Sequence, residues 1–219
     1  MTLHLAIANK RYSSWSMRPW LVLKAFGIAF EETVIPLREP DTASRIAAFS
    51  PAGRVPVLVD GDVTVWDSLA IIEYLAERFP SHAIWPADAK ARAHARAIAA
   101  EMHSGFQSLR SKCSMNLGAV HPPRDRGADV VAETARVEAL WAEARTRFGG
   151  GGAFLFGAFS AADAMYAPVV TRFDSYSIPV RPETRAYMET VKAHPAFVEW
   201  RAGALAETWR IPDYERDKA

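Results

Sequence analysis

The chain has 219 residues, half of them hydrophobic, and its 26 basic and 25 acidic side chains leave a formal charge of +1. This length suits one large or two small domains, and the near-neutral charge argues against nucleic acid or an anionic membrane as a partner. The single cysteine, Cys113, excludes an intrachain disulfide and fits a reducing compartment. The first residues lack the pattern of a secretion signal, and no apolar run approaches the ~20 residues of a membrane span, so we expect a cytoplasmic protein.

The first 80 residues alternate between strand and helix patterns. The predicted elements are a strand at 3–8, a helix at 16–27 capped by Ser16, a strand at 30–36, a short helix at 42–49, a hairpin around Asp60-Gly61 and a helix at 68–79. Asp-Gly between two β-branched runs is a strong hairpin signal. Pro19 would fall in the first helical turn, where its missing N–H costs little. The predicted order is β-α-β-α-β-β-α.

Beyond this point every long segment has a helical pattern. We expect helices at 89–117, 125–148, 161–174, 183–193 and 195–208. The polar stretch 81–88, which contains Pro86, separates the two kinds of pattern. The sequence therefore predicts an α/β domain at 1–80, a linker at 81–88 and an all-α domain at 89–219.

Three serines, Ser13, Ser14 and Ser16, lie in the loop between the first predicted strand and helix. Backbone N–H groups and the helix dipole favour a negative charge at such a position, and a hydroxyl there can donate a hydrogen bond to an anion. The alternative is that the serines only cap the helix, because serine is a common cap residue.

Two residue pairs further along have binding potential. Val55-Pro56 precedes a predicted strand, where proline is tolerated and where a cis peptide would turn the Val55 backbone towards a peptide-like ligand. Asp67-Ser68 opens the next helix, so Ser68 and the helix N-terminus would hold a carboxylate while Asp67 holds an ammonium group. Simple capping is the alternative for this second pair.

No metal site is expected from the sequence. The six histidines show no i, i+3 or i+4 spacing, and no cysteine lies near them in a ligand pattern. Ser160-Ala161-Ala162-Asp163 has the pattern of a capping box, with a structural role.

The order and spacing of these motifs resemble the cytosolic glutathione S-transferase family over nearly the whole chain. The most specific segments are 50–58, SPAGRVPVL, and 67–75, DSLAIIEYL. The resemblance implies a thioredoxin-like N-terminal domain, an all-α helical-bundle domain that carries the electrophile site, glutathione as the cosubstrate, and a homodimer. Segment 13–18 is similar to serine-using zeta-type and related bacterial members, in which a serine at the position of Ser13 activates the thiol.

The resemblance also implies roles for individual residues. Ser14 would assist or replace Ser13, and Tyr12 is a weaker donor to the sulfur. Val55 and Pro56 would hold the cysteinyl part of glutathione, and Asp67 and Ser68 its γ-glutamyl end.

The remaining parts of the expected site are less specific. Arg54 is the nearest cation for the glycine carboxylate, and Arg38 is a poorer candidate. Candidates for the wall of the electrophile site are Met102, His103, Phe106, Arg110, Met115, Asn116 and Tyr166, although packing is the simpler role for each. Conjugation of a small hydrophobic electrophile, as in detoxification, is the expected reaction.

One residue departs from the zeta-type pattern. Trp15 stands where those proteins usually carry a cysteine, which leaves the zeta-type reaction, maleylacetoacetate isomerisation, as an alternative to conjugation. Exchange through a protein thiol is disfavoured because Cys113 lies far from the loop in the sequence. A binding or assembly module that has lost chemistry is the second alternative.

Overall fold

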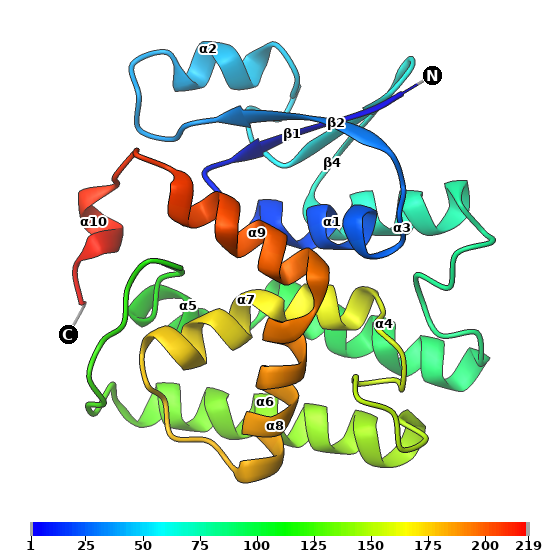
Figure 1. Ribbon diagram of the computed structural model, residues 1–219, viewed down its shortest axis with the longest axis vertical. Coiled ribbons are helices and arrows are strands. Elements are labelled where there is room, and N and C mark those ends of the chain that lie inside the picture. Colours follow the sequence, from blue (N-terminus) through cyan, green and yellow to red (C-terminus); the bar gives the residue numbers. More distant parts are fainter. Residues whose placement is uncertain (1, 218–219) are drawn as a thin grey trace.

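The computed structural model describes residues 2–217 and consists of a sheet layer above a helical layer (Figure 1). The sheet has the strand order β2-β1-β3-β4. Strand β1 (Leu3–Ala8) pairs in parallel with β2 (Phe30–Ile35). Strand β3 (Val57–Asp60) runs antiparallel to β1 and forms the predicted hairpin with β4 (Val63–Trp66).

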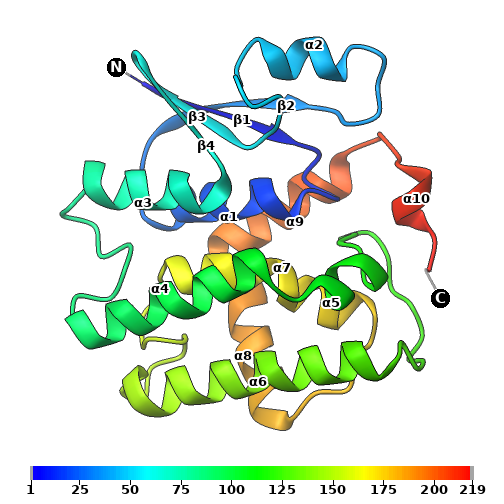
Figure 2. The same ribbon diagram turned by 180° about the vertical axis from the view of Figure 1, so that it is seen from behind.

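Helices cover both faces of this sheet. Helices α1 (Ser14–Ala25) and α3 (Ser68–Arg78) lie between the sheet and the helical layer, whereas α2 (Thr42–Ala47) covers the outer face (Figures 1 and 2). The predicted β-α-β-α-β-β-α order is thereby confirmed.

The rest of the chain is helical, as predicted. Its helices are α4 (Ala89–Ser104), α5 (Gln107–Lys112), α6 (Ala128–Phe148), α7 (Ala161–Ser175), α8 (Pro182–Ala193), α9 (Pro195–Ala206) and α10 (Pro212–Glu215). Helix α7 is almost wholly buried and packs against α1 and α4, while α9 returns to α1. The indole rings of Trp20 in α1 and Trp200 in α9 lie 5.1 Å apart, so one continuous core joins the two layers. The division into domains at residues 81–88 stays a proposal.

Two predicted helices and one additional helix differ from the sequence prediction, besides shifts of one to three residues at the ends of other elements. Helix α1 begins at Ser14, because Ser13 rather than Ser16 is its N-cap and accepts a hydrogen bond from the Ser16 amide. Pro19 consequently lies in the second turn. The helix expected at 89–117 is broken at Gly105 and Phe106, where Phe106 adopts a left-handed conformation with φ of 57°. Helix α10 was not predicted.

The capping box at the start of α7 is confirmed. The buried carboxylate of Asp163 accepts hydrogen bonds from the backbone amides of Leu155 and Ser160 at 3.1 and 2.9 Å, and from the Tyr187 hydroxyl at 2.9 Å. Burial raises the pKa of Asp163 to about 6. This carboxylate therefore ties the start of α7 to α8.

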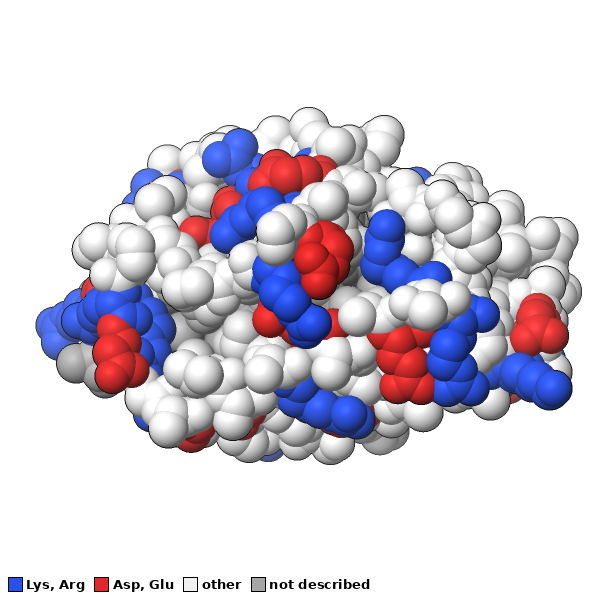
Figure 3. Space-filling view, turned by 90° about the horizontal axis from the view of Figure 1, so that it is seen from below, with Lys and Arg blue, Asp and Glu red and all other residues white. Residues whose placement is uncertain are grey.

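The outer surface carries both signs of charge. Acidic and basic side chains are interleaved on the face seen from below (Figure 3). Over residues 2–217, none of the helices combines the length and the apolar character that crossing a bilayer requires.

Candidate active site

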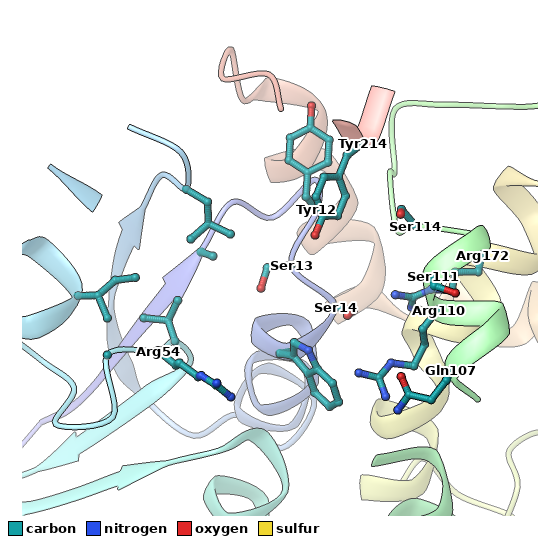
Figure 4. A pocket seen from close by; sticks show the side chains of 16 residues that line it. Tyr12, Ser13, Ser14, Arg54, Gln107, Arg110, Ser111, Ser114, Arg172 and Tyr214 are labelled. Carbon is teal, nitrogen blue, oxygen red and sulfur yellow. The ribbon is translucent and has the colours of Figure 1, made fainter. Parts of the chain in front are cut away.

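Two adjoining cavities lie between the end of the sheet and the helical layer, and Figure 4 shows the first of them. The first, of about 480 Å³, is lined by Ser13, Ser14 and Arg172 among others, and we call it the serine cavity. The second, of about 640 Å³, is lined by Asp67 and Ser68 among others, and we call it the aspartate cavity. Residues that line both are Trp15, Arg54, Val55, Gln107 and Arg110.

Ser13 lies at the positive end of helix α1. Its hydroxyl donates to Ser16 Oγ at 2.8 Å, and Ser16 Oγ in turn accepts from the backbone amide of Ala8 at 3.0 Å. Ser16 is fully buried. A chain of hydrogen bonds therefore runs from the end of β1 through Ser16 to the hydroxyl that lines the serine cavity.

Tyr12 and Ser14, the two neighbours of Ser13, differ from it in how their hydroxyl groups are placed. Tyr12 also lines the serine cavity, but its hydroxyl donates to the Glu215 carboxylate. Burial and this hydrogen bond raise the pKa of Tyr12 to about 12, which makes it a poor acid. Ser14 lines the cavity on the side of α7 and α5, whereas Ser13 lies nearer to Arg54 (Figure 4).

The peptide bond between Val55 and Pro56 is cis. Val55 borders both cavities and Pro56 borders the aspartate cavity. The exposed Arg54 side chain points into the serine cavity from the sheet side (Figure 4). Arg38 is exposed, has a φ of 69°, and lines neither cavity.

Asp67 and Ser68 meet at the start of helix α3. Asp67 is the N-cap and accepts from the Leu69 amide at 2.9 Å, with a φ of 75° in the left-handed region. Ser68 is 1% exposed, and its hydroxyl has no hydrogen-bond partner among residues 2–217. A buried hydroxyl without a partner beside a helix N-terminus is suited to bind the carboxylate of a ligand.

Arginines line the helical side of the serine cavity. Arg110 and Arg172 both point towards the cavity opposite Ser13 (Figure 4). The guanidinium carbons of Arg18 and Arg110 lie 4.2 and 4.7 Å from the centroid of the Trp15 ring. Burial, together with Arg172 and Arg110 nearby, lowers the pKa of Arg18 well below its usual value. Arg110 and Arg172 make the helical wall of the serine cavity positive.

Only part of the expected electrophile wall lies at these cavities. Arg110 borders both cavities and His103 borders the aspartate cavity. The other candidates line neither cavity and are buried in packing: Met102, Phe106, Met115, Asn116 and Tyr166. The packing role therefore applies to those five.

Arg172 and Tyr214 also line the serine cavity, although neither was predicted from the sequence. Arg172 is a charged residue within the largely apolar sequence of α7. A charged residue at such a position is unusual and could have indicated a site residue. The Asn116 side chain donates a hydrogen bond to the Tyr214 carbonyl at 3.1 Å, although the two residues are 98 positions apart. No local sequence pattern indicates that Tyr214 lines the cavity. Within residues 2–217, no group of three or more His, Cys, Asp or Glu side chains is arranged to hold a metal ion.

Comparison with known proteins gives two family matches. Residues 12–78 match the N-terminal domain of glutathione S-transferases, and residues 124–203 match the C-terminal domain. A probable maleylacetoacetate isomerase of Caenorhabditis elegans is 41% identical over 97 residues, or 44% of each chain. A zeta-class glutathione S-transferase of Euphorbia esula is 33% identical over 105 residues, or 48% of this chain and 47% of the relative.

These curated alignments span about half the length of each relative. A solved structure gives wider coverage: a glutathione transferase homologue from Burkholderia, with bound glutathione, is 26% identical with a TM-score of 0.70. That match covers 94% of this chain and all of the other. The thioredoxin-like and helical arrangement expected from the sequence is confirmed by these matches.

Proposed function

This chain is a member of the glutathione S-transferase family, and we propose that it is a glutathione transferase that ionises the glutathione thiol at Ser13 for attack on a small electrophile. One observation carries the proposal: the serine hydroxyls, the Val55 backbone and the Asp67-Ser68 pair border two adjoining cavities. A ligand that is a peptide at its centre and an α-amino acid at one end requires this combination of groups.

The aspartate cavity would hold the γ-glutamyl end of glutathione. Its α-carboxylate would accept from the unpartnered Ser68 hydroxyl and the first turn of α3, and its ammonium group would pair with Asp67. Val55, with Pro56 behind it, would pair with the cysteinyl backbone. The exposed Arg54 guanidinium would hold the glycine carboxylate, and Arg38 is the poorer candidate because it lines neither cavity.

Ser13 would then stabilise the thiolate. Its hydroxyl turns from Ser16 to the sulfur, and the Ser16 hydroxyl donates to Ser13 in return while still accepting from Ala8. Lowering the pKa of a thiol by two units requires about 2.7 kcal/mol. A charge-assisted hydrogen bond supplies about 1.5–3 kcal/mol, and the N-terminus of α1 adds about 0.3–1 kcal/mol. Ser14 is the alternative donor.

The chemical step needs no further group from the protein. The thiol proton leaves to water when glutathione binds, because the thiolate form is preferentially stabilised. In a substitution, the sulfur forms a bond to the electrophilic carbon and the leaving group departs with its electron pair. Alignment of the two reactants in adjoining cavities supplies the remaining rate enhancement.

A zeta-type isomerase is the second candidate. It is favoured by the 41% identity to the probable maleylacetoacetate isomerase, and it would use the same thiolate for reversible addition to a double bond. Assays of cis–trans isomerisation and of conjugation with the same preparation distinguish the two reactions. A glutathione-binding module without turnover would fail both assays and still bind the thiol.

The decisive experiment is a pH titration of thiolate absorbance for glutathione bound to the wild type and to Ser13→Ala. We expect the bound thiol to titrate well below its free pKa in the wild type and near the free value in the variant. Bound glutathione with an unshifted pKa in the wild type would overturn the Ser13 mechanism.

The homodimer and the cytoplasmic location belong to the same proposal, since both come from the family resemblance. Sedimentation equilibrium of the purified protein tests the first, and cell fractionation tests the second.

A further inference from the structure

Helix α5 is a short element that forms part of the wall of both cavities. Its residues Gln107 and Arg110 line both cavities and Ser111 lines the serine cavity, and all three lie across that cavity from Ser13 (Figure 4). In the proposed binding mode, glutathione is held by the starts of α1 and α3 and by the loop around Val55. Helix α5 therefore faces the side on which the second substrate must lie.

Little within α5 itself fixes its position. The helix has six residues, fewer than an isolated helix needs to be stable in water, and of these six only Leu109 is buried. Its N-cap residue is Phe106, whose left-handed conformation separates α5 from α4. A phenyl side chain cannot accept a hydrogen bond from the first amides of the helix, so their acceptor must come from elsewhere.

Glu133, a partly buried residue of α6, supplies that acceptor. Its two carboxylate oxygens accept hydrogen bonds from the backbone amides of Ser108 at 3.2 Å and of Leu109 at 2.7 Å. A negative charge at this end of a helix also interacts favourably with the helix dipole. Burial lowers the pKa of Arg110, and the charge of Glu133 opposes this shift. The cap of α5 thus comes from a different helix, 24 residues after Leu109.

A second carboxylate of α6 holds the other end of α5. The ammonium group of Lys112 lies 2.7 and 2.8 Å from the two carboxylate oxygens of Asp129. Asp129 and Glu133 are one helical turn apart, so they project from the same side of α6, and α5 lies against the first turns of that helix (Figure 2). The pair of Lys112 and Asp129 is exposed and contributes little, which leaves Glu133 as the stronger attachment.

We propose that Glu133 is a positioning residue for the second substrate: by capping α5 from α6, it holds the wall formed by Gln107, Arg110 and Ser111 in place across the serine cavity from Ser13. This inference rests on the proposed function and adds to it a residue that lines neither cavity.

The expected effect is selective for the second substrate. Without its cap, α5 occupies the position that this substrate requires for a smaller fraction of the time, and the affinity of the substrate falls by that fraction. The groups proposed to bind glutathione lie on other elements, so the affinity for glutathione should change little.

Two thioethers of glutathione separate these effects. The methyl group of S-methylglutathione stays near Ser13, whereas the ring of S-(2,4-dinitrophenyl)glutathione extends towards α5, and calorimetry measures the binding of both without turnover. We expect the wild type to bind the dinitrophenyl thioether more tightly than the methyl thioether. Glu133→Ala should lose about fivefold or more of this preference, the effect of one missing helix cap, and should bind S-methylglutathione almost as the wild type does.

Two further variants complete the test. Glutamine at position 133 keeps one carbonyl acceptor but loses the charge, so Glu133→Gln should recover part of the preference. Glu143 is an exposed residue near the other end of α6, paired with Arg147, and Glu143→Ala should behave as the wild type. Hydrogen exchange reports on the cap directly: the amides of Ser108 and Leu109 should exchange faster in Glu133→Ala and unchanged in Glu143→Ala.

Three results would overturn the inference. They are equal losses on both thioethers in Glu133→Ala, as a general destabilisation of the fold would cause; an unchanged preference in that variant; and a wild type that does not prefer the dinitrophenyl thioether. If Glu133→Ala does not fold, Glu133→Gln decides by the same criteria. In each case a lowered pKa of the bound glutathione thiol leaves the proposed function in place, whereas a wild type that does not bind glutathione overturns both.

Discussion

The Tyr12 hydroxyl donates a hydrogen bond to the Glu215 carboxylate and thereby joins the site loop to helix α10, 203 residues later in the chain. The rings of Tyr12 and Tyr214 lie 5.5 Å apart, and Tyr214 lines the serine cavity. The Glu207 carboxylate forms a second connection between the C-terminal segment and the site loop, since it accepts hydrogen bonds from the backbone amides of Lys10 and Arg11. The C-terminal segment is therefore part of the cavity wall, and Tyr12 is its anchor.

Tyr12→Phe should leave the chemistry intact. The pKa of Tyr12 is raised to about 12, so its hydroxyl stays protonated through neutral pH and is already committed to Glu215. We expect the pKa of bound glutathione to equal that of the wild type, and the free energy of unfolding to fall by about 1 kcal/mol for the lost hydrogen bond. Thiolate absorbance and urea denaturation measure the two effects. A rise in the thiol pKa as large as that in Ser13→Ala would instead make Tyr12 the sulfur donor.

Ser16→Ala should act on the thiol only through Ser13. The variant leaves the buried Ala8 amide without its partner, which costs about 1–3 kcal/mol of stability, and it removes the donor that supports Ser13. We expect the bound thiol pKa to rise by less than in Ser13→Ala. The double variant should have the thiol pKa of Ser13→Ala alone, because Ser16 has no other route to the sulfur. Additive shifts in the double variant would refute this arrangement.

Most of the fold was predictable because its elements have local signals. The alternation of apolar residues in β1, the Asp60-Gly61 turn and the Asp67 cap each lie within a few residues of the element that they define. The start of α1 was misplaced because Ser13, Ser14 and Ser16 have equal capping propensity, and only the tertiary bond from the Ala8 amide assigns Ser16 a different role.

The lining of the two cavities was predictable where its residues lie on one short segment. Asp67 and Ser68 are adjacent in sequence and share a cavity. Arg172 and Tyr214 reach the serine cavity from α7 and α10, and their placement depends on how distant helices pack, which local pattern does not encode. Arg38 is near these residues in sequence, but it lines neither cavity.

Asp67→Asn should weaken glutathione binding through the ammonium group, and it also removes the carboxylate charge that lies 3.2 Å from His103 Nε2. The amide oxygen of asparagine can still accept from the Leu69 amide, so the cap of α3 is kept while the charge is lost. We expect the Kd for glutathione to rise about tenfold, as for one charge-assisted contact. A glutathione analogue without the α-amino group should bind the wild type as weakly as glutathione binds the variant. If Asp67→Asn also weakens binding of that analogue, Asp67 does not contact the ammonium group.

Asp163 should make the stability of the protein fall as the pH rises through the weakly acidic range. Its pKa is raised by burial from 3.8 to about 6, so the folded protein binds this proton more tightly than the unfolded chain does. The contribution of this group to the free energy of unfolding is therefore at its full value below about pH 4 and decreases between about pH 4 and 6. Above that range the contribution is lost, with a total decrease of about 3 kcal/mol. Asp163→Asn cannot titrate and cannot accept all the bonds from Leu155, Ser160 and Tyr187, so it should be less stable throughout. The difference between wild type and variant, measured by urea denaturation at pH 4.5 and 7, should be larger at the lower pH. A difference that grows towards neutral pH would mean that the hydrogen bonds outweigh burial and keep the carboxylate ionised.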